Sequence, residues 1–236
     1  MDFGDLPCDF LFVKAIVLFG SPGSGKGTQA KLMKTRLEIP HISTGDMLRD
    51  RIRRGVGIGS AVVASMQSGA LVPDEVVNQM VEERLNLPDA RKGFILDGYP
   101  RTMDQAEHLS RWLDERGMCE LVIHLAVDYN VIIARLTGRR QCPRCGTLYN
   151  IVSQPPKRPG LCDLDGEQLV IRDDDRESVI RERLDAYERQ TRPILDYYRS
   201  SKRWMYEVDA SSDPPDVVFQ RICQAMEADD CSKNRR

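Results

Sequence analysis

Residues 20–28 read Gly-Ser-Pro-Gly-Ser-Gly-Lys-Gly-Thr, and this segment determines the class of fold that the chain can adopt. It follows the apolar, β-branched run 15–19 and opens a segment of helical composition. A strand, a glycine-rich turn and a helix in this order build a phosphate-binding loop (P-loop). The glycines let backbone N–H groups turn toward an anion, and the helix N-terminus adds its partial positive charge. We expect Lys26 to reach the outer phosphates of a ligand as a point charge.

The loop departs from the general pattern G-x-x-x-x-G-K-[ST] at its last position. Gly27 follows the lysine, and the hydroxyl comes one residue later, at Thr28. This departure marks a variant of the general loop. The competing interpretation is a chance glycine-rich turn, and we reject it because strand, loop, lysine and helix coincide.

Short apolar segments recur along the chain and predict strands. They lie at 15–19, 93–96, 121–127 and 204–208. Helical patterns lie between them, at 74–86, 102–116 and 178–199. Pro193 is expected to kink the third helix. The alternation predicts an α/β fold with a parallel sheet flanked by helices. Ligands bind such sheets at the carboxyl ends of the strands, where the P-loop and Asp97 would both lie.

Two segments break this alternation. Residues 43–72 hold short helical pieces between glycines, and residues 138–175 hold clustered cysteines and prolines. Both look like insertions into one core. The domain division that we expect is a core of 13–42, 73–137 and 176–227, an N-terminal extension of 1–12 and a polar, frayed tail of 228–236.

The bulk composition excludes several classes of function. The chain has 236 residues and a net charge of -2, so no basic field attracts nucleic acid or an anionic membrane. No apolar run approaches the roughly 18 residues of a membrane helix. The N-terminal segment lacks the basic region and apolar centre of a secretory signal. We therefore expect a cytoplasmic protein that binds neither nucleic acid nor membrane.

Three of the seven cysteines gather in one segment as Cys142-x2-Cys145-x16-Cys162, followed after two residues by Asp165. Paired ligands at this spacing suit tetrahedral Zn²⁺ held by three thiolates and one carboxylate, with no open position for water. Asp163 competes as the fourth ligand, although its spacing fits less well. A redox Cys-x-x-Cys pair is the alternative interpretation.

Five motifs in order resemble adenylate kinase over residues 13 to 225. They are the P-loop 20–28, Ser-Thr-Gly-Asp-Met-Leu-Arg at 43–49, Leu-Asp-Gly-Tyr-Pro-Arg-Thr at 96–102, Gly-Arg-Arg at 138–140 and Arg-Asp-Asp-Asp at 172–175. The resemblance implies the P-loop nucleoside monophosphate kinase fold, with an AMP-binding insertion at 43–72 and a mobile lid at 138–175. It implies reversible phosphoryl transfer from MgATP to AMP, giving two ADP, by a monomer. The cysteine cluster resembles that of long-lid bacterial members, in which the metal is structural.

Phosphoryl transfer between two nucleotides concentrates negative charge, so it needs several guanidiniums but no general base. We accordingly expect structural or surface roles for His41, His108 and His124. By resemblance, the catalytic residues are Lys26, Arg101, Arg139, Arg172 and Arg183. The residues expected to bind ATP are Gly23, Ser24, Gly25, Lys26, Gly27, Thr28, Arg135, Arg139, Leu148, Tyr149 and Ser212. Asp97 is expected to hold Mg²⁺ through water, although a strand-end aspartate can instead cap a turn.

The resemblance also implies a second nucleotide site. The residues expected to bind AMP are Thr44, Arg49, Ala70, Leu71, Val72, Gly98, Tyr99, Pro100, Arg101, Gln105, Arg172 and Arg183. Relatives that prefer pyrimidine nucleotides tend to have alanine in place of Thr44, and the amide of Gln105 can bond adenine with both ends. Tyr99 and Ala70 replace the more usual Phe and Lys. Asp174 and Asp175 are expected to lock the closed lid.

Two other functions remain open at this point. A GTP:AMP phosphotransferase shares the AMP motif and differs around the donor base, near Arg139, Leu148, Tyr149 and Ser212. A zinc-ribbon protein that binds nucleic acid and carries a P-loop belongs to another class, and the acidic net charge disfavours it.

Overall fold

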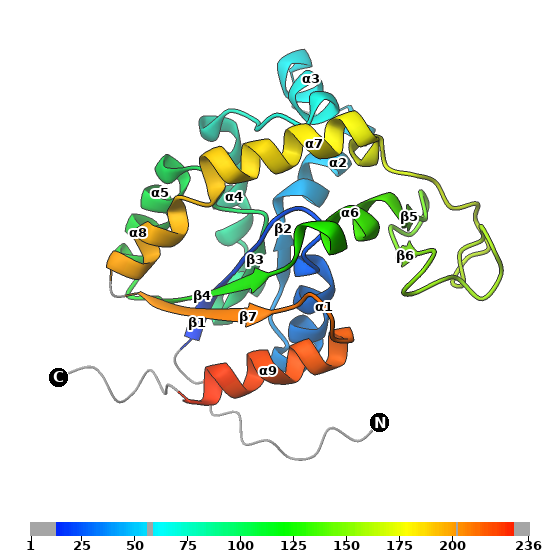
Figure 1. Cartoon of the computed structure of the whole chain (residues 1–236). Helices are drawn as coiled ribbons and strands as arrows, with labels where there is room; N and C mark the ends of the chain where they lie inside the picture. Colours follow the sequence, from blue (N-terminus) through cyan, green and yellow to red (C-terminus); the bar gives the residue numbers. More distant parts are fainter. Residues whose placement is uncertain (1–12, 56–58, 202, 229–236) are drawn as a thin grey trace.

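The computed structural model describes residues 13–55, 59–201 and 203–228, so the extension 1–12 and all but the first residue of the tail lie outside it. A five-stranded parallel sheet forms the centre, in the order β2-β3-β1-β4-β7 (Figure 1). The strands are β1 (Val13–Phe19), β2 (His41–Ser43), β3 (Phe94–Asp97), β4 (Cys119–Ala126) and β7 (Trp204–Asp209). Helices cover both faces, which is the P-loop nucleoside monophosphate kinase fold that the sequence predicts.

The alternation of side chains along β1 explains why both faces are covered. Ile16 and Leu18 pack on one face against α1 (Lys26–Leu37) and α9 (Pro215–Ala228). Ala15 and Val17 pack on the other face. The helices there are α4 (Asp74–Leu85), α5 (Met103–Glu115) and α8 (Ile194–Ser200). Because residues 15–19 of β1 are buried on both faces, this part of the strand is a continuous apolar run and not an alternating one.

The remaining elements belong to the two inserted segments and to the connections of the core. They are α2 (Thr44–Arg54), α3 (Ser60–Ser68), η1 (Pro88–Lys92), α6 (Tyr129–Thr137), β5 (Arg139–Gln141), β6 (Leu148–Asn150), η2 (Asp173–Asp175), α7 (Glu177–Ala186) and η3 (Tyr187–Thr191). The pair β5–β6 is antiparallel and forms a separate small sheet. Among the described residues, no helix is long and apolar enough to cross a bilayer.

The four predicted strands are confirmed to within about two residues at each end, and β2 was missed. It has three residues with one fully buried side chain, Ile42, which is too little for a periodic signal. The predicted single helix over 178–199 is interrupted. The chain widens into the π-helical turn η3, in which Arg192 N–H donates to Tyr187 O at 2.8 Å, directly before Pro193. Proline has no N–H to continue the ladder, so the expected disruption at Pro193 is confirmed.

A buried carboxylate ties the sheet to two helices at the end opposite the P-loop. The Glu120 side chain on β4 is completely buried. It accepts the hydroxyl of Tyr198 at 2.7 Å and lies 3.0 Å from Arg203 Nη1. Arg203 also binds Asp114 of α5 at 2.8 Å. Burial raises the pKa of Glu120 to about 7, although the Tyr198 bond and the Arg203 charge oppose the shift.

Replacing Glu120 with glutamine should change how stability depends on pH. Between pH 4.5 and 7 the folded protein keeps a proton on Glu120 that the unfolded chain has released, so wild-type stability falls with rising pH relative to E120Q. From pH 4.5 to 7, the unfolding free energy of the wild type should fall relative to that of E120Q by at most about 3 kcal/mol. Urea unfolding at pH 5, 6 and 7 measures it, and parallel curves for the two proteins would contradict the prediction.

Candidate active site

The P-loop joins β1 to α1 and turns its lysine back over its own backbone. Gly25 caps α1 with a φ of 98°, a left-handed conformation that favours glycine. The ammonium of Lys26 donates to Gly20 O at 2.7 Å and to Ser21 O at 2.8 Å. Burial lowers the pKa of Lys26 to about 8; the charge of Asp97 opposes this shift and three arginines add to it. A phosphate at this position would therefore stabilise the protonated lysine.

The structure explains the departure at Gly27. A Cβ built there would lie 3.3 Å from Asp97 Oδ2, so a hydroxyl side chain at this position would crowd the carboxylate. Asp97 ends β3, directly beside β1, where Leu18 is its partner in the sheet. Its position supplies the carboxylate that the resemblance assigns to Mg²⁺.

Asp97 also has a partner on the edge strand, because His41 Nε2 lies 3.3 Å from Asp97 Oδ2. Burial works to raise the pKa of Asp97, but the bond to His41 and the charge of Lys26 outweigh it, so the pKa is lowered. The carboxylate is therefore ionised at neutral pH. His41, which was expected to be structural or on the surface, contacts a candidate site residue.

Five arginines from separate elements lie close to one another, and three of them also lie near Lys26 of the P-loop. They are Arg49 of α2, Arg101 after β3, Arg139 of β5, Arg172 before η2 and Arg183 of α7. Burial lowers the pKa of Arg101 to about 10, and the positive charge of Arg183 adds to this shift. Burial likewise lowers the pKa of Arg172 to about 10, and the positive charge of Arg49 adds to that shift. Mutual repulsion of this kind shows that the guanidiniums lie close together, which favours an anionic ligand between them.

Asp174 and Asp175 hold three of these guanidiniums, those of Arg49, Arg139 and Arg183, in place. Asp175, with a fully buried side chain, binds Arg139 through Nε at 2.7 Å and through Nη2, and lies 3.1 Å from Arg183 Nη1. Asp174 lies 3.1 Å from Arg183 Nη1 and 3.5 Å from Arg49 Nη1. The two aspartates thus join the beginning and end of the segment 138–175 to α7 and α2, which suits the lid-closing role predicted for them.

Asp46 is a site residue that sequence reasoning did not single out. Its Oδ1 accepts from Arg49 Nη2 at 2.6 Å and lies 3.9 Å from Arg172 Nη2. The charge of Arg49 and its hydrogen bond lower the pKa of Asp46 against the effect of burial. The signal was present, since Asp46 and Arg49 stand three residues apart in one motif and i,i+3 residues share a helix face. Arg49 keeps one buried nitrogen, Nε, without a partner.

The segment 96–105 brings several predicted AMP residues together. Gly98 has a φ of 78°, and a Cβ there would lie 2.8 Å from Arg101 Nη2 and 3.1 Å from Thr44 Oγ1. The carbonyl of Gly98 accepts from Thr44 at 2.7 Å and from Arg101 Nε at 2.8 Å. The Tyr99–Pro100 peptide bond is cis. Only glycine at position 98 allows this close approach.

Gln105 makes a hydrogen bond to the protein at each end of its amide. Its Oε1 accepts from Arg101 N at 2.8 Å, and its Nε2 donates to Asp74 Oδ1 at 2.6 Å. Each end of the amide keeps capacity for a second hydrogen bond, so the bidentate contact with adenine stays a prediction. The Tyr99 hydroxyl donates to Asn78 Oδ1 at 2.7 Å. This contact gives a partner to the hydroxyl that distinguishes Tyr99 from the more usual Phe.

The loop between α3 and α4 lines the same insertion. Ala70 is exposed, Leu71 is half-buried and Val72 is buried. Val72 belongs to the core cluster that covers this face of the sheet. The loop is thereby anchored at one end, and the contact of its backbone with AMP stays a prediction.

The residues predicted for the donor nucleotide lie around α6 and the loop after β7. Arg135 Nη2 donates to Ala210 O at 2.7 Å and to Ser211 O at 3.2 Å, which places α6 beside the loop that carries exposed Ser212. Leu148 is half-buried on β6. Tyr149 is buried, and its hydroxyl accepts from Asp163 N at 2.8 Å, so this side chain belongs to the interior of the segment 138–175.

The cysteine cluster is built from two matching turns. Cys142 N–H donates to Thr147 O at 2.9 Å, and Gly146 N–H donates to Cys142 O at 3.0 Å. In the second turn, Cys162 N–H donates to Glu167 O at 2.8 Å and Gly166 N–H to Cys162 O at 2.9 Å. The turns place the ligand atoms of Cys142, Cys145, Cys162 and Asp165 within 4.8 Å of one another.

The repeated geometry bears on the choice between the two aspartates. Asp165 precedes Gly166 as Cys145 precedes Gly146, so it occupies the equivalent position of the second turn. Asp163 Oδ1 instead accepts from Lys157 N at 2.9 Å. Three sulfurs and one carboxylate oxygen at this separation match the ligand set of tetrahedral zinc, so the residues present fit the metal.

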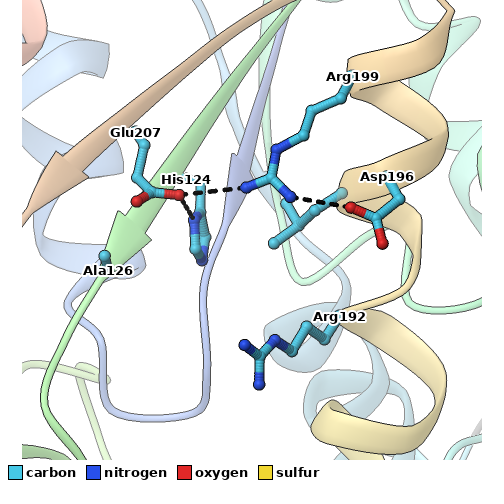
Figure 2. Close-up of a pocket in the computed structure, with 7 residues that line it drawn as sticks. His124, Ala126, Arg192, Asp196, Arg199 and Glu207 are labelled. Carbon is cyan, nitrogen blue, oxygen red and sulfur yellow. Dashed lines mark hydrogen bonds and ion pairs between the residues drawn. The ribbon is translucent and has the colours of Figure 1, made fainter.

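A separate hollow of about 440 Å³ lies between α8 and the strands β4 and β7 (Figure 2). His124 Nδ1 and Glu207 lie 3.0 Å apart there, and Arg199 bonds Asp196 at 2.9 Å. Arg192, which points into the hollow, bonds Glu188 at 2.7 Å. Since these charges are paired with one another, we assign no ligand to this hollow.

Comparison with known proteins agrees with the geometry. The family model described as Adenylate kinase matches residues 18–203. A protein named adenylate kinase from Moorella thermoacetica is 48% identical over 205 residues, covering 86% of this chain and 94% of its own. Those from Methanocella arvoryzae and Caldanaerobacter subterraneus are 46% and 44% identical, covering 86% and 91% of this chain and 94% and 96% of theirs. The matched region carries the P-loop and the arginine cluster, and the chain belongs to the adenylate kinase family.

Proposed function

We propose that this protein transfers the terminal phosphoryl group of MgATP reversibly to AMP, giving two ADP. The observation that carries the proposal is a cluster of five arginines, three of which lie close to the lysine of the P-loop. Lys26 lies close enough to Arg101, Arg139 and Arg183 for their charges to lower its pKa. One bound nucleotide would not need so many cations, whereas two nucleotides meeting phosphate to phosphate would.

The roles of the residues follow from the chemistry. The loose transition state spreads charge over the equatorial oxygens of the transferred group, so catalysis consists of positioning and electrostatic stabilisation. Lys26 would hold the outer phosphates of the donor, and Arg49 and Arg101 the phosphate of AMP. Arg139, Arg172 and Arg183 would close over the transferred group with their planar forks. The acceptor is already an anionic oxygen, so no histidine is needed as a base.

The domain division remains part of the proposal. Residues 43–72 would form the AMP-binding insertion, and residues 138–175 a lid that moves as one body over the core. Closure would exclude water, which prevents hydrolysis of ATP and strengthens each contact between arginine and phosphate. The bonds of Asp175 to Arg139 and Arg183 support a closed position of the lid.

Cys142, Cys145, Cys162 and Asp165 would hold a structural zinc ion in the lid. When bound, the ion supplies no chemistry to the reaction and fixes the two turns together. The lid needs such a link, because its own apolar cluster holds only three fully buried residues, Cys142, Tyr149 and Cys162. Magnesium enters with ATP as part of the substrate.

Removal of zinc should lower thermal stability and leave catalysis largely intact. Arg49, Arg139 and Arg183 are held by aspartates, Arg101 by Gly98 O and Arg172 by Gln141 Oε1, and none of these contacts involves a proposed zinc ligand. Activity at 25 °C should therefore stay within about twofold, while the melting temperature falls by several degrees. Metal analysis, thermal unfolding and turnover before and after treatment with a chelator measure this. A purified protein without zinc, unaffected by a chelator, would contradict the metal assignment.

The substrates are tested by a coupled assay that pairs ATP or GTP with AMP, UMP or CMP. We expect ATP with AMP to have the highest kcat/KM, by at least about tenfold over any other pair. GTP as the preferred donor would replace the proposal by the related phosphotransferase, which the names of the relatives do not favour. Turnover with no pair, together with binding of an oligonucleotide at low salt, would favour the nucleic-acid alternative.

A further inference from the structure

The sulfur cluster in the segment 138–175 has one accessible member. Cys142 and Cys162 are 0% and 1% exposed, whereas Cys145 is exposed. The buried sulfurs pack with Tyr149 and Leu169. A small oxidant dissolved in water therefore meets the cluster first at Cys145, and accessibility is a principal determinant of which thiol is oxidised.

The sulfur of Cys145 is in contact with the sulfur of the other turn. Cys145 Sγ lies 3.5 Å from Cys162 Sγ. Cys142 Sγ also lies within 4.8 Å of both sulfurs, but its own short contacts are with each carboxylate oxygen of Asp165, at 3.4 Å, and with the Cys145 N–H, which it accepts at 3.4 Å. A disulfide needs the two sulfurs at about 2.05 Å, so Cys145 and Cys162 would have to approach by about 1.5 Å.

We propose that the lid carries a redox-modification site, at which a peroxide joins Cys145 to Cys162 in a disulfide. In the first step, the Cys145 thiolate attacks one oxygen of hydrogen peroxide; the O–O bond breaks, hydroxide leaves and a sulfenic acid forms. In the second step, the Cys162 thiolate attacks the sulfenic sulfur; the S–S bond forms and a second hydroxide leaves. The two sulfurs together lose two electrons, and peroxide gains them.

The site couples oxidation to the metal that we propose for the lid, and this part rests on that proposal. Disulfide formation removes two of the four ligands, and Cys142 and Asp165 alone do not make a tetrahedral site. The new bond also joins the two turns covalently. Oxidised protein should therefore melt at a temperature between those of the zinc-loaded and the zinc-free, reduced protein.

The experiment treats the full-length, zinc-analysed protein with hydrogen peroxide and follows three readouts. A chromogenic chelator reports released zinc, thermal unfolding reports stability, and alkylation followed by peptide mapping reports each cysteine. We expect one zinc released per disulfide, and a peptide that links Cys145 to Cys162. A disulfide between Cys142 and Cys145, or zinc release with all three thiols still open to alkylation, would overturn the proposal.

Single substitutions separate the two steps. C162S should stop the reaction at the sulfenic acid, which a cyclic 1,3-dione traps on Cys145. C145S should abolish the disulfide and slow peroxide-dependent zinc release by at least about tenfold. C119S is the control for general thiol loss and should leave the disulfide yield unchanged. A preparation that contains no zinc would refute the metal assignment and would leave the disulfide proposal open to test. Peptide mapping would still show whether peroxide links Cys145 to Cys162.

Discussion

Lys26→Met should lower kcat by about a hundredfold to a thousandfold, because it removes one preorganised charge that stabilises the transition state. The ammonium is the cation of the P-loop, and its charge is placed among those of Arg101, Arg139 and Arg183. Stability should change little. The variant loses the bonds to Gly20 O and Ser21 O, but it no longer has the energetic cost of burying a charged ammonium. Steady-state turnover at saturating ATP and AMP measures the first effect, and urea unfolding the second.

The matched control is Lys31→Met, on the exposed side of the same helix. It makes the same chemical change and should keep turnover within about twofold, since surface substitutions away from a site have small effects. A folded Lys26→Met protein with nearly wild-type turnover would refute the assignment of the P-loop to catalysis. A variant that fails to fold would be replaced by Lys26→Arg, which keeps the charge and changes its geometry.

Most of the fold could be predicted from the sequence because its core strands are long, apolar and separated by helical segments. Strand β1 was found because both its faces are buried. Strand β2 was missed because pairing with β3 holds its three residues, and their own pattern is too short to show it. The segment 178–199 was predicted as one helix with a kink because its charge pairs extend through η3, and Pro193, shortly after η3, was the sequence signal for the break.

The site could be predicted to the level of residue types and motifs, but not of contacts. Linear spacing does not show that Asp175 joins Arg139 to Arg183, which lie 44 residues apart in the sequence (183 − 139). It also did not show that Gln105 is bonded at both ends. The sequence spacing favoured Asp165 over Asp163 as the fourth proposed ligand, and the structure places Asp165 with the three cysteines, where Gly146 and Gly166 each follow the last residue of the cluster in their turn.

Arg139→Ala should also lower kcat strongly, by about a hundredfold, because Arg139 stands at the start of the proposed lid and Asp175 holds its guanidinium in place. The cost in stability should be moderate. Asp175 is fully buried, but it keeps Arg183 Nη1 at 3.1 Å, so its charge is not left unpaired. Turnover should therefore fall far more than the unfolding free energy, for which about 1–3 kcal/mol is the expected loss of a charge-assisted bond.

Two further variants distinguish a catalytic Arg139 from a structural one. Arg139→Lys keeps the positive charge but cannot bond Asp175 through two parallel nitrogens, so turnover should lie between that of wild type and alanine. Arg140→Ala removes the neighbouring guanidinium, which bonds only backbone carbonyls of Thr137 and Arg139, and should leave turnover within about twofold. If Arg139 were structural, kcat would follow stability across the three variants. If it contacts the transferred group, kcat falls in Arg139→Ala at temperatures where the protein remains folded.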